Sequence, residues 1–115
     1  MDKFVIPLVE YFNANGLPTY MSCQGHNSTN MSMFWIAFTD EVGVKDIERF
    51  QHKHLDSFGQ FCSCGRFAKR YVVCKNEPIN RWEYYAATIK AAMTDLSKWK
   101  SDDITSLAQT IPTTD

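Results

Sequence analysis

The stretch Phe34-Trp35-Ile36-Ala37-Phe38 constrains the fold more than any other part of the chain. Five consecutive apolar residues, rich in aromatic types, predict a β-strand. Successive side chains of a strand point to opposite faces of the sheet, so this strand is apolar on both faces. One layer of helices covers only one of them. We therefore expect a second copy of the chain or a ligand to cover the other.

The other segments alternate between helical and strand patterns. Apolar residues at helical spacing predict helices over residues 3–14, from about Val44, and over 77–100, with Gly16 ending the first. Strands are predicted over 18–23 and 31–39. Residues 59–75 contain two segments with β-strand character, one on each side of Cys64-Gly65. Ser101 is expected to cap a further short helix.

This order predicts an α+β fold, a two-layer sandwich. It would have a small antiparallel or mixed sheet of three to five strands with helices packed mainly on one face. Residues 1–100 would form a single domain, and residues 101–115 a short helix with a flexible tail.

Composition narrows the functional classes. The net charge of −1 argues against a duplex-DNA binder, because such affinity depends on neutralising many phosphates. No apolar run approaches the ~20 residues that span a bilayer, so no membrane partner is expected. The N-terminal residues lack the pattern of a signal peptide, which predicts a cytoplasmic protein with reduced thiols.

The stretch Ser22-Cys23-Gln24-Gly25-His26 is the first candidate site. Gly25 permits a sharp turn that exposes backbone N–H groups to an anion, and His26 can bind phosphate. Hydroxyl and amide partners would come from Thr19, Ser22 and Asn27. The alternative is a plain turn with Cys23 in the core and His26 exposed, and the residues favour neither interpretation.

A second candidate site lies in residues 64–74, where basic and aromatic residues alternate. Arg66 and Arg70 suit bidentate pairing with phosphate, and neighbouring aromatic residues offer stacking faces for a base. The alternative is an edge strand whose charges prevent aggregation. The predicted ligand-binding set is Thr19, Ser22, Gly25, His26, Asn27, Trp35, Arg66 and Arg70.

Zinc is a further possibility. Cys23, His26, Cys62 and Cys64 are suitable ligands for a tetrahedral site, although the Cys-x-Cys spacing is shorter than the usual knuckle. They would converge only if residues 19–23 and 61–64 formed neighbouring strands. No other cofactor is expected. Cys23 lacks an evident base and orienting group, so we expect no catalytic residue.

The pattern Gly16-x2-Thr19-x2-Ser22-Cys23-x-Gly25-His26, followed by Phe34–Phe38, resembles small accessory proteins of tailed bacteriophages. The turn also resembles the "SCSGR" turn of the tRNA wybutosine-modification methyltransferase family, with His26 where that family has arginine. The phage resemblance implies a regulator, an inhibitor of a host enzyme, or a protein that sequesters defence nucleotides in the host cytoplasm.

The leading hypothesis is a non-enzymatic homodimer that binds or sequesters a phosphate-bearing small molecule or nucleotide, possibly a host defence signal. The alternative is a protein–protein inhibitor of a host enzyme, and a third is an RNA-modification enzyme.

Overall fold

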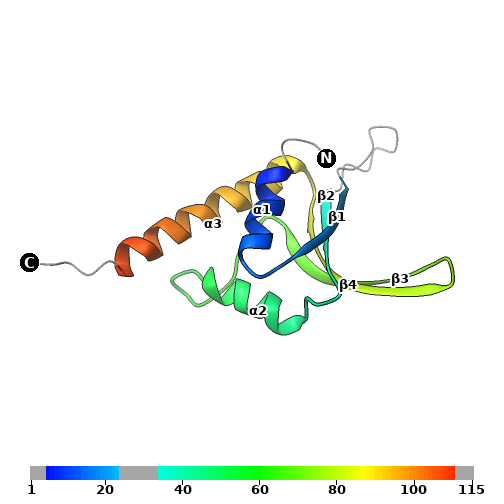
Figure 1. The fold of residues 1–115 in the computed structure, drawn as a ribbon. Helices are drawn as coiled ribbons and strands as arrows, with labels where there is room; N and C mark the ends of the chain where they lie inside the picture. The colour runs from blue at the N-terminus through cyan, green and yellow to red at the C-terminus, as the bar shows by residue number, and fades with distance from the viewer. Residues whose placement is uncertain (1–4, 24–33, 111–115) are drawn as a thin grey trace, which may run out of the picture.

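The computed structural model describes residues 5–23 and 34–110 (Figure 1). Its elements in chain order are α1 (Ile6–Ala14), β1 (Thr19–Cys23), β2 (Phe34–Phe38), α2 (Val44–Lys53), β3 (Arg66–Cys74), β4 (Glu77–Ala86) and α3 (Ile89–Thr110). The predicted first helix, the strands around residues 19–23 and 34–38, and the helix from Val44 are confirmed.

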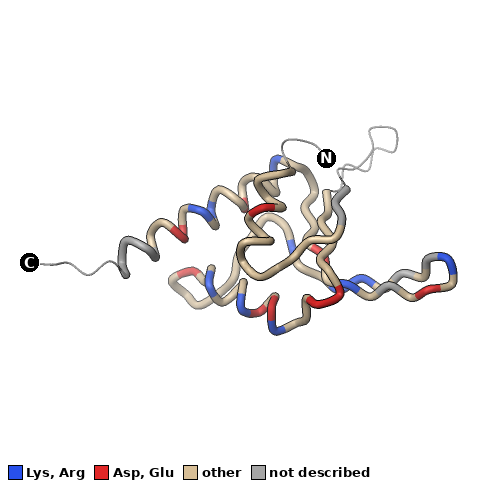
Figure 2. Tube along the Cα trace, in the orientation of Figure 1, with Lys and Arg blue, Asp and Glu red and all other residues tan. Residues whose placement is uncertain are grey.

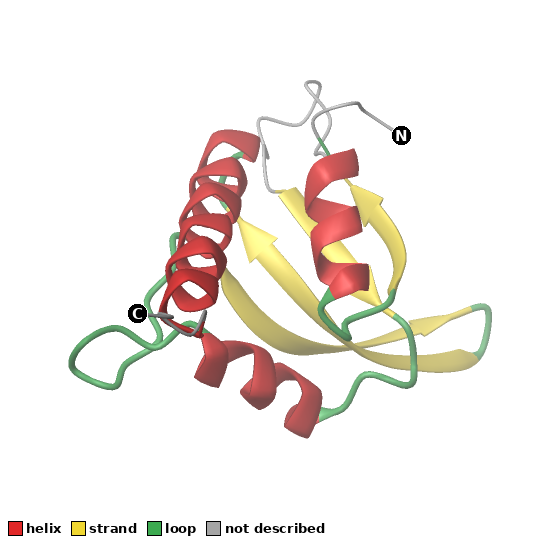
Figure 3. Ribbon diagram, turned by 60° about the vertical axis from the view of Figure 1, so that its left-hand side comes forward, coloured by secondary structure: helices red, strands yellow, loops and turns green. Residues whose placement is uncertain are grey.

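The strands form an antiparallel sheet in the order β1-β2-β4-β3, and the three helices pack on one of its faces (Figure 3). The predicted α+β two-layer fold is therefore confirmed. Among the described residues, no helix is long and apolar enough to cross a membrane.

Aromatic side chains fill the space between the helices and the sheet. Phe12 of α1 lies at the centre, with ring centroids 5.2 Å from Phe38, 5.4 Å from Tyr84 and 5.7 Å from Trp99. Phe12 is fully buried. Burying one such side chain contributes about 2–3 kcal/mol, so this cluster holds the two layers together.

The prediction of a helix over residues 77–100 is wrong in its first half. Residues 77–86 form β4, and the helix begins only at Ile89. Trp82, Tyr85 and Ala86 fit a helical stripe, but in the structure Tyr84 and Ala86 face the core while Tyr85 faces away. Residues 77–86 form a strand because they pair with β2 on one side and β3 on the other. Local periodicity carries no information about which strands lie alongside.

The hairpin turn lies at Lys75-Asn76, and of the two β-like segments predicted around Cys64-Gly65 only the second forms a strand, β3. Both turn residues have positive φ, 51° for Lys75 and 67° for Asn76, as a tight two-residue turn between antiparallel strands requires. Pro78 is tolerated because it pairs only with Val73 of β3, where β4 has no second neighbour among the described strands.

The β3–β4 pair extends beyond the rest of the sheet. β2 pairs with β4 only between Glu83 and Ala86, whereas β3 follows β4 down to Glu77. We call Lys69–Cys74 with Glu77–Trp82 the ribbon; it projects from the body of the molecule (Figure 1). At the other end of the chain, α3 continues without a break through Ser101, where the sequence predicts a separate helix.

Candidate functional site

The face of the sheet opposite the helices carries the best candidate site. Residues paired across an antiparallel sheet share a face, so the register assigns this face directly. Among the described residues no helix covers it. We call it the open face: Trp35 and Ala37 from β2, Arg81, Glu83 and Tyr85 from β4, and Arg66, Ala68 and Arg70 from β3.

Arg70 and Trp35 meet on the open face although two different strands carry them. The Arg70 guanidinium carbon lies 6.0 Å from the centroid of the Trp35 ring, at the outer limit of a cation–π contact. The same guanidinium lies 3.8 Å from a carboxylate oxygen of Glu83. Both of these contacts are long, the guanidinium also interacts with the Tyr85 hydroxyl, and Arg70 is exposed, so several of its donors remain open to a ligand.

Glu83 is a buried carboxylate at the floor of the open face. It pairs with Ala37 on one side and Ala68 on the other, two residues with small side chains. The Tyr85 hydroxyl donates a hydrogen bond to Glu83, and the pKa of Tyr85 is raised to about 12, first by burial and then by this carboxylate. Tyr85 is therefore a neutral donor at physiological pH.

Arg81 is held at the edge of the open face. Its Nε donates to Asp40 at 2.7 Å, and its guanidinium carbon lies 4.1 Å from the centroid of the Tyr20 ring. The ion pair with Asp40 is the main reason that the pKa of Arg81 is raised. Compared with Arg70, Arg81 has its partners in place, so it frames the site.

Arg66 borders a groove of about 490 Å³ that is also lined by Cys64, Gly65, Tyr85 and Ala87. Arg66 is exposed and makes no ion pair with any described residue. A guanidinium at the rim of a groove, beside a tyrosine ring, suits an anionic group attached to a flat ring.

A buried carboxylate from the helix layer positions this groove. Asp95 of α3 accepts hydrogen bonds from the backbone N–H groups of Cys64 (2.7 Å) and Gly65 (2.8 Å) and from the Tyr84 hydroxyl (2.6 Å). A Cβ atom on Gly65 would lie 2.3 Å from the Tyr85 carbonyl oxygen. Only glycine fits this close approach, which fixes the chain immediately before Arg66.

The structure brings together three of the predicted ligand-binding residues, Trp35, Arg66 and Arg70. Thr19 lies at the far end of β1, opposite Phe38, and its backbone N–H donates to Asn13. Ser22 pairs through its backbone with Ile36, and its side chain is outside the described part. Gly25, His26 and Asn27 also lie outside the described residues, so their role stays a prediction.

The zinc prediction depended on neighbouring strands, and that condition is not met. β1, which contains Cys23, and β3, which follows Cys62 and Cys64, occupy opposite edges of the sheet. Three strand spacings separate Cys23 from Arg66, about 14 Å. Among the described residues no group of three or more histidine, cysteine or acidic residues could hold a metal. His26 lies outside them.

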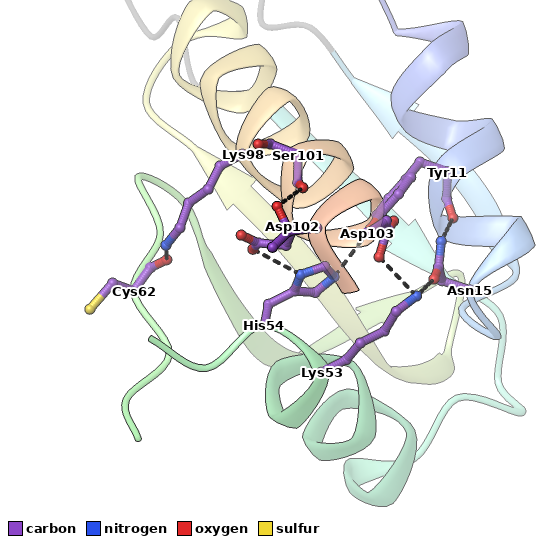
Figure 4. A network of polar contacts seen from close by, with 10 residues as sticks. Tyr11, Asn15, Lys53, His54, Cys62, Lys98, Ser101, Asp102 and Asp103 are labelled. Carbon is purple, nitrogen blue, oxygen red and sulfur yellow. Dashed lines mark hydrogen bonds and ion pairs between the residues drawn. The ribbon is translucent and has the colours of Figure 1, made fainter. Parts of the chain in front are cut away.

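The sequence analysis missed a second polar cluster, where the three helices meet (Figure 4). We call it the helix junction. It comprises Tyr11 of α1, Asn15 directly after α1, Lys53 and His54 at the end of α2, and Asp102 and Asp103 of α3. His54 contacts the Tyr11 hydroxyl through Nε2 and Asp102 through Nδ1, each at 3.1 Å.

The side chains of Tyr11, His54 and Asp102 are arranged like an acid–base triad, but the burial of His54 excludes that role. Only 2% of His54 is exposed, and its ring packs 4.9 Å from that of Phe50. Burial lowers the pKa of His54 despite the nearby carboxylate of Asp102. No substrate reaches such a ring, so the junction serves to lock the helices together.

Cys64, the cysteine that lines the groove, is not activated as a nucleophile. Cys62 contacts Asp56 through its thiol at 3.7 Å, and the negative charge of Asp95 raises the pKa of the Cys64 thiol. A reactive cysteine needs a lowered pKa. Cys64 therefore lines the groove as an ordinary thiol.

Comparison with known proteins gives no further guidance, because no family model, curated protein or solved structure matches the chain. The function has to be argued from the open face itself.

Proposed function

We propose that the open face binds a phosphate-bearing ligand with a flat ring, a nucleotide in the first instance, and that the protein sequesters it. The observation that carries this proposal is the position of Arg70 over Trp35, next to the Arg66 groove. Two guanidinium groups and two aromatic rings would then contact one ligand.

The ring of the ligand would stack on Trp35 or Tyr85. Both side chains are half-buried, so each is fixed at its base and offers part of its ring to solvent. Stacking of a base on an aromatic side chain contributes about 1–3 kcal/mol. An arginine next to the stack adds a cation–π contribution, and Arg70 is already placed to supply it.

The phosphate would pair with Arg66 and Arg70. These two are the exposed arginines of the open face, while Arg81 is held by Asp40. Arginine pairs with phosphate through two parallel hydrogen bonds, which gives both affinity and orientation. The residues Gly25, His26 and Asn27 remain predicted additions to this site, because they follow β1 at the end where Cys23 pairs with Trp35.

A role as an accessory protein that captures a host signalling nucleotide is the most concrete form of the proposal. The resemblance of the "SCQGH" stretch to phage accessory proteins supports this choice of ligand. Binding without turnover needs only the stacking and ion-pairing groups above.

Isothermal titration against linear and cyclic nucleotides tests the proposal. Trp35→Ala and Arg66→Ala should each weaken binding about tenfold or more, since each removes one principal contact. Lys69→Ala is the matched control, because Lys69 is an exposed cation of β3 next to Arg70 but pairs with Trp82 on the other face of the sheet. No heat with any nucleotide, or equal losses in Lys69→Ala and Arg66→Ala, would contradict the proposal.

A further inference from the structure

The open face carries a second exposed aromatic side chain beside an arginine. Tyr20 of β1 is 58% exposed, and the Arg81 guanidinium carbon lies 4.1 Å from the centroid of its ring. The pairing of β1 with β2 shifts by one residue between Thr19 and Met21, as at a β-bulge, which re-aims the side chain of the extra residue. Because Arg81 belongs to the open face, its contact with the Tyr20 ring places that ring on the same side of the sheet.

Trp35 and Tyr20 lie at separate places on the open face. Trp35 pairs with Cys23, and Tyr20 precedes Cys23 by three residues in β1. At about 3.3 Å per residue, the two positions are roughly 10 Å apart along the strands. Each ring has its own guanidinium, that of Arg70 at Trp35 and that of Arg81 at Tyr20. The open face therefore offers two separate aromatic surfaces, each of which suits the stacking of one base.

The exposed arginines of the open face are also separated from each other. Arg66 and Arg70 are four residues apart in β3, so about 13 Å of strand lies between their Cα atoms. Arg66 forms no ion pair with any described residue, and Arg70 keeps open donors beside Glu83. In a single nucleotide both side chains would have to share one phosphate. In a strand of nucleotides each guanidinium can pair with a phosphate of its own.

The strands that carry these arginines are the basic part of the molecule (Figure 2). Residues 66–86, which include β3 and β4, contain five basic and two acidic residues, whereas the rest of the chain contains seven basic and eleven acidic ones. Glu83, and Asp40 at the edge, reduce the charge of the open face, but its three arginines still outnumber these two carboxylates. A basic region in an otherwise acidic chain favours a polyanion at that region.

We propose that the open face binds a single-stranded oligonucleotide, with one base on Trp35, another on Tyr20, and separate phosphates on Arg66 and Arg70. The strand replaces the single nucleotide of the proposed function, on which this inference rests. A duplex does not fit, because its bases stack on one another and cannot lie on the two rings. The two rings read no sequence, since every base has a flat face that can stack.

Isothermal titration of single nucleotides against short strands tests the number of bases bound. Thymidine monophosphate is compared with a single strand of six thymidines, and uridine monophosphate with a single strand of six uridines, all at one salt concentration because affinity depends on salt. Each strand should bind about thirtyfold or more tightly than its monophosphate, since a second stacked base and a second phosphate are added. This gain exceeds the few-fold gain that the repeated units of a strand give a site for one base. A twelve-base-pair DNA duplex should bind at least about tenfold more weakly than six thymidines.

Tyr20→Ala separates this inference from the proposed function. It should weaken binding of the six-nucleotide strands about tenfold and leave binding of the monophosphates to Trp35 unchanged, with the circular dichroism of wild type. Tyr20→Phe keeps the ring and should bind strands as wild type does. Tyr71→Ala is the matched control and should change neither affinity, because Tyr71 is 65% exposed on the other side of β3, the side that begins with the core residue Phe67.

Three results would overturn the inference and leave the proposed function standing. They are a strand that binds no more tightly than its repeated units require, a duplex that binds as tightly as the strand, and a Tyr20→Ala variant that binds strands like wild type or loses monophosphate and strand alike. Absence of heat with every monophosphate and every strand would overturn both.

Discussion

The open face and the helix junction use similar residues for opposite purposes. Each combines a tyrosine, a carboxylate and a cationic or titratable group. At the helix junction the hydrogen bonds of Tyr11 and His54 lie between 2.7 and 3.1 Å and His54 is buried, so these polar groups already have their partners. On the open face, Arg66 has no ion pair among the described residues, and the exposed Arg70 has a 3.8 Å ion pair with Glu83 and an interaction with the Tyr85 hydroxyl. Polar groups whose hydrogen bonds are all made indicate a structural cluster. Unused hydrogen-bond donors at the surface are what the proposed binding site requires.

Removal of His54 tests whether the helix junction is purely structural. His54→Ala should lower the free energy of unfolding by about 3 kcal/mol, because it leaves a cavity beside Phe50 and Trp99 and removes a hydrogen bond from Tyr11. Urea unfolding measures this loss, and nucleotide affinity of the folded fraction should be unchanged. The exposed neighbour His52 is the control, since His52→Ala should change stability by less than about 0.5 kcal/mol. A ligand-binding defect in folded His54→Ala would contradict the structural role.

The pH dependence of stability is a second, smaller test of the same cluster. Burial lowers the pKa of His54 below its ordinary value of 6.5, so the unfolded chain takes up a proton more readily than the folded one. Stability should therefore fall as the pH drops below about 6.5, and should be regained above it. Urea midpoints on either side of this pH should differ less in His54→Gln than in wild type. His52→Gln should keep the wild-type difference, and an equal loss in both variants would rule out His54 as the cause.

The smallest expected effect belongs to the open face. Glu83→Gln keeps the shape of the floor and removes a negative charge beside Arg70, so affinity for a phosphate-bearing nucleotide should rise about threefold. Calorimetry measures the change. Glu77→Gln, at the far end of β4, is the matched control and should have no effect. Weaker nucleotide binding in Glu83→Gln would mean that Glu83 helps to place Arg70 instead of opposing the phosphate.

Local sequence patterns predicted the parts of the fold that depend on local chemistry. The strand Phe34–Phe38 and the helix from Val44 follow from apolar spacing. That a second chain or a ligand covers the other face of this strand stays a prediction. Trp35, Arg66 and Arg70 were chosen by residue type, and the register brings them to one face.

Contacts between distant segments could not be predicted in the same way. Tyr85 and Glu83 were missed because residues 77–86 match a helical stripe, and only pairing with β2 and β3 makes them a strand. The spacing of Ile47, Phe50 and His54 places all three on one face of a helix. The partner of His54, Asp102, lies 48 residues later, and no local pattern links the two. The turn at Lys75-Asn76 lacks the glycine that usually marks a tight hairpin.

The three tryptophans are distributed so that each reports on a different event. Trp35 lies on the open face, Trp82 pairs with Lys69 where the ribbon begins, and Trp99 is fully buried in the core. Chains that keep one tryptophan and replace the other two by phenylalanine would each carry a single optical probe. A ligand on the open face, a change at the base of the ribbon and unfolding of the core would then give three separately readable fluorescence signals in one small protein.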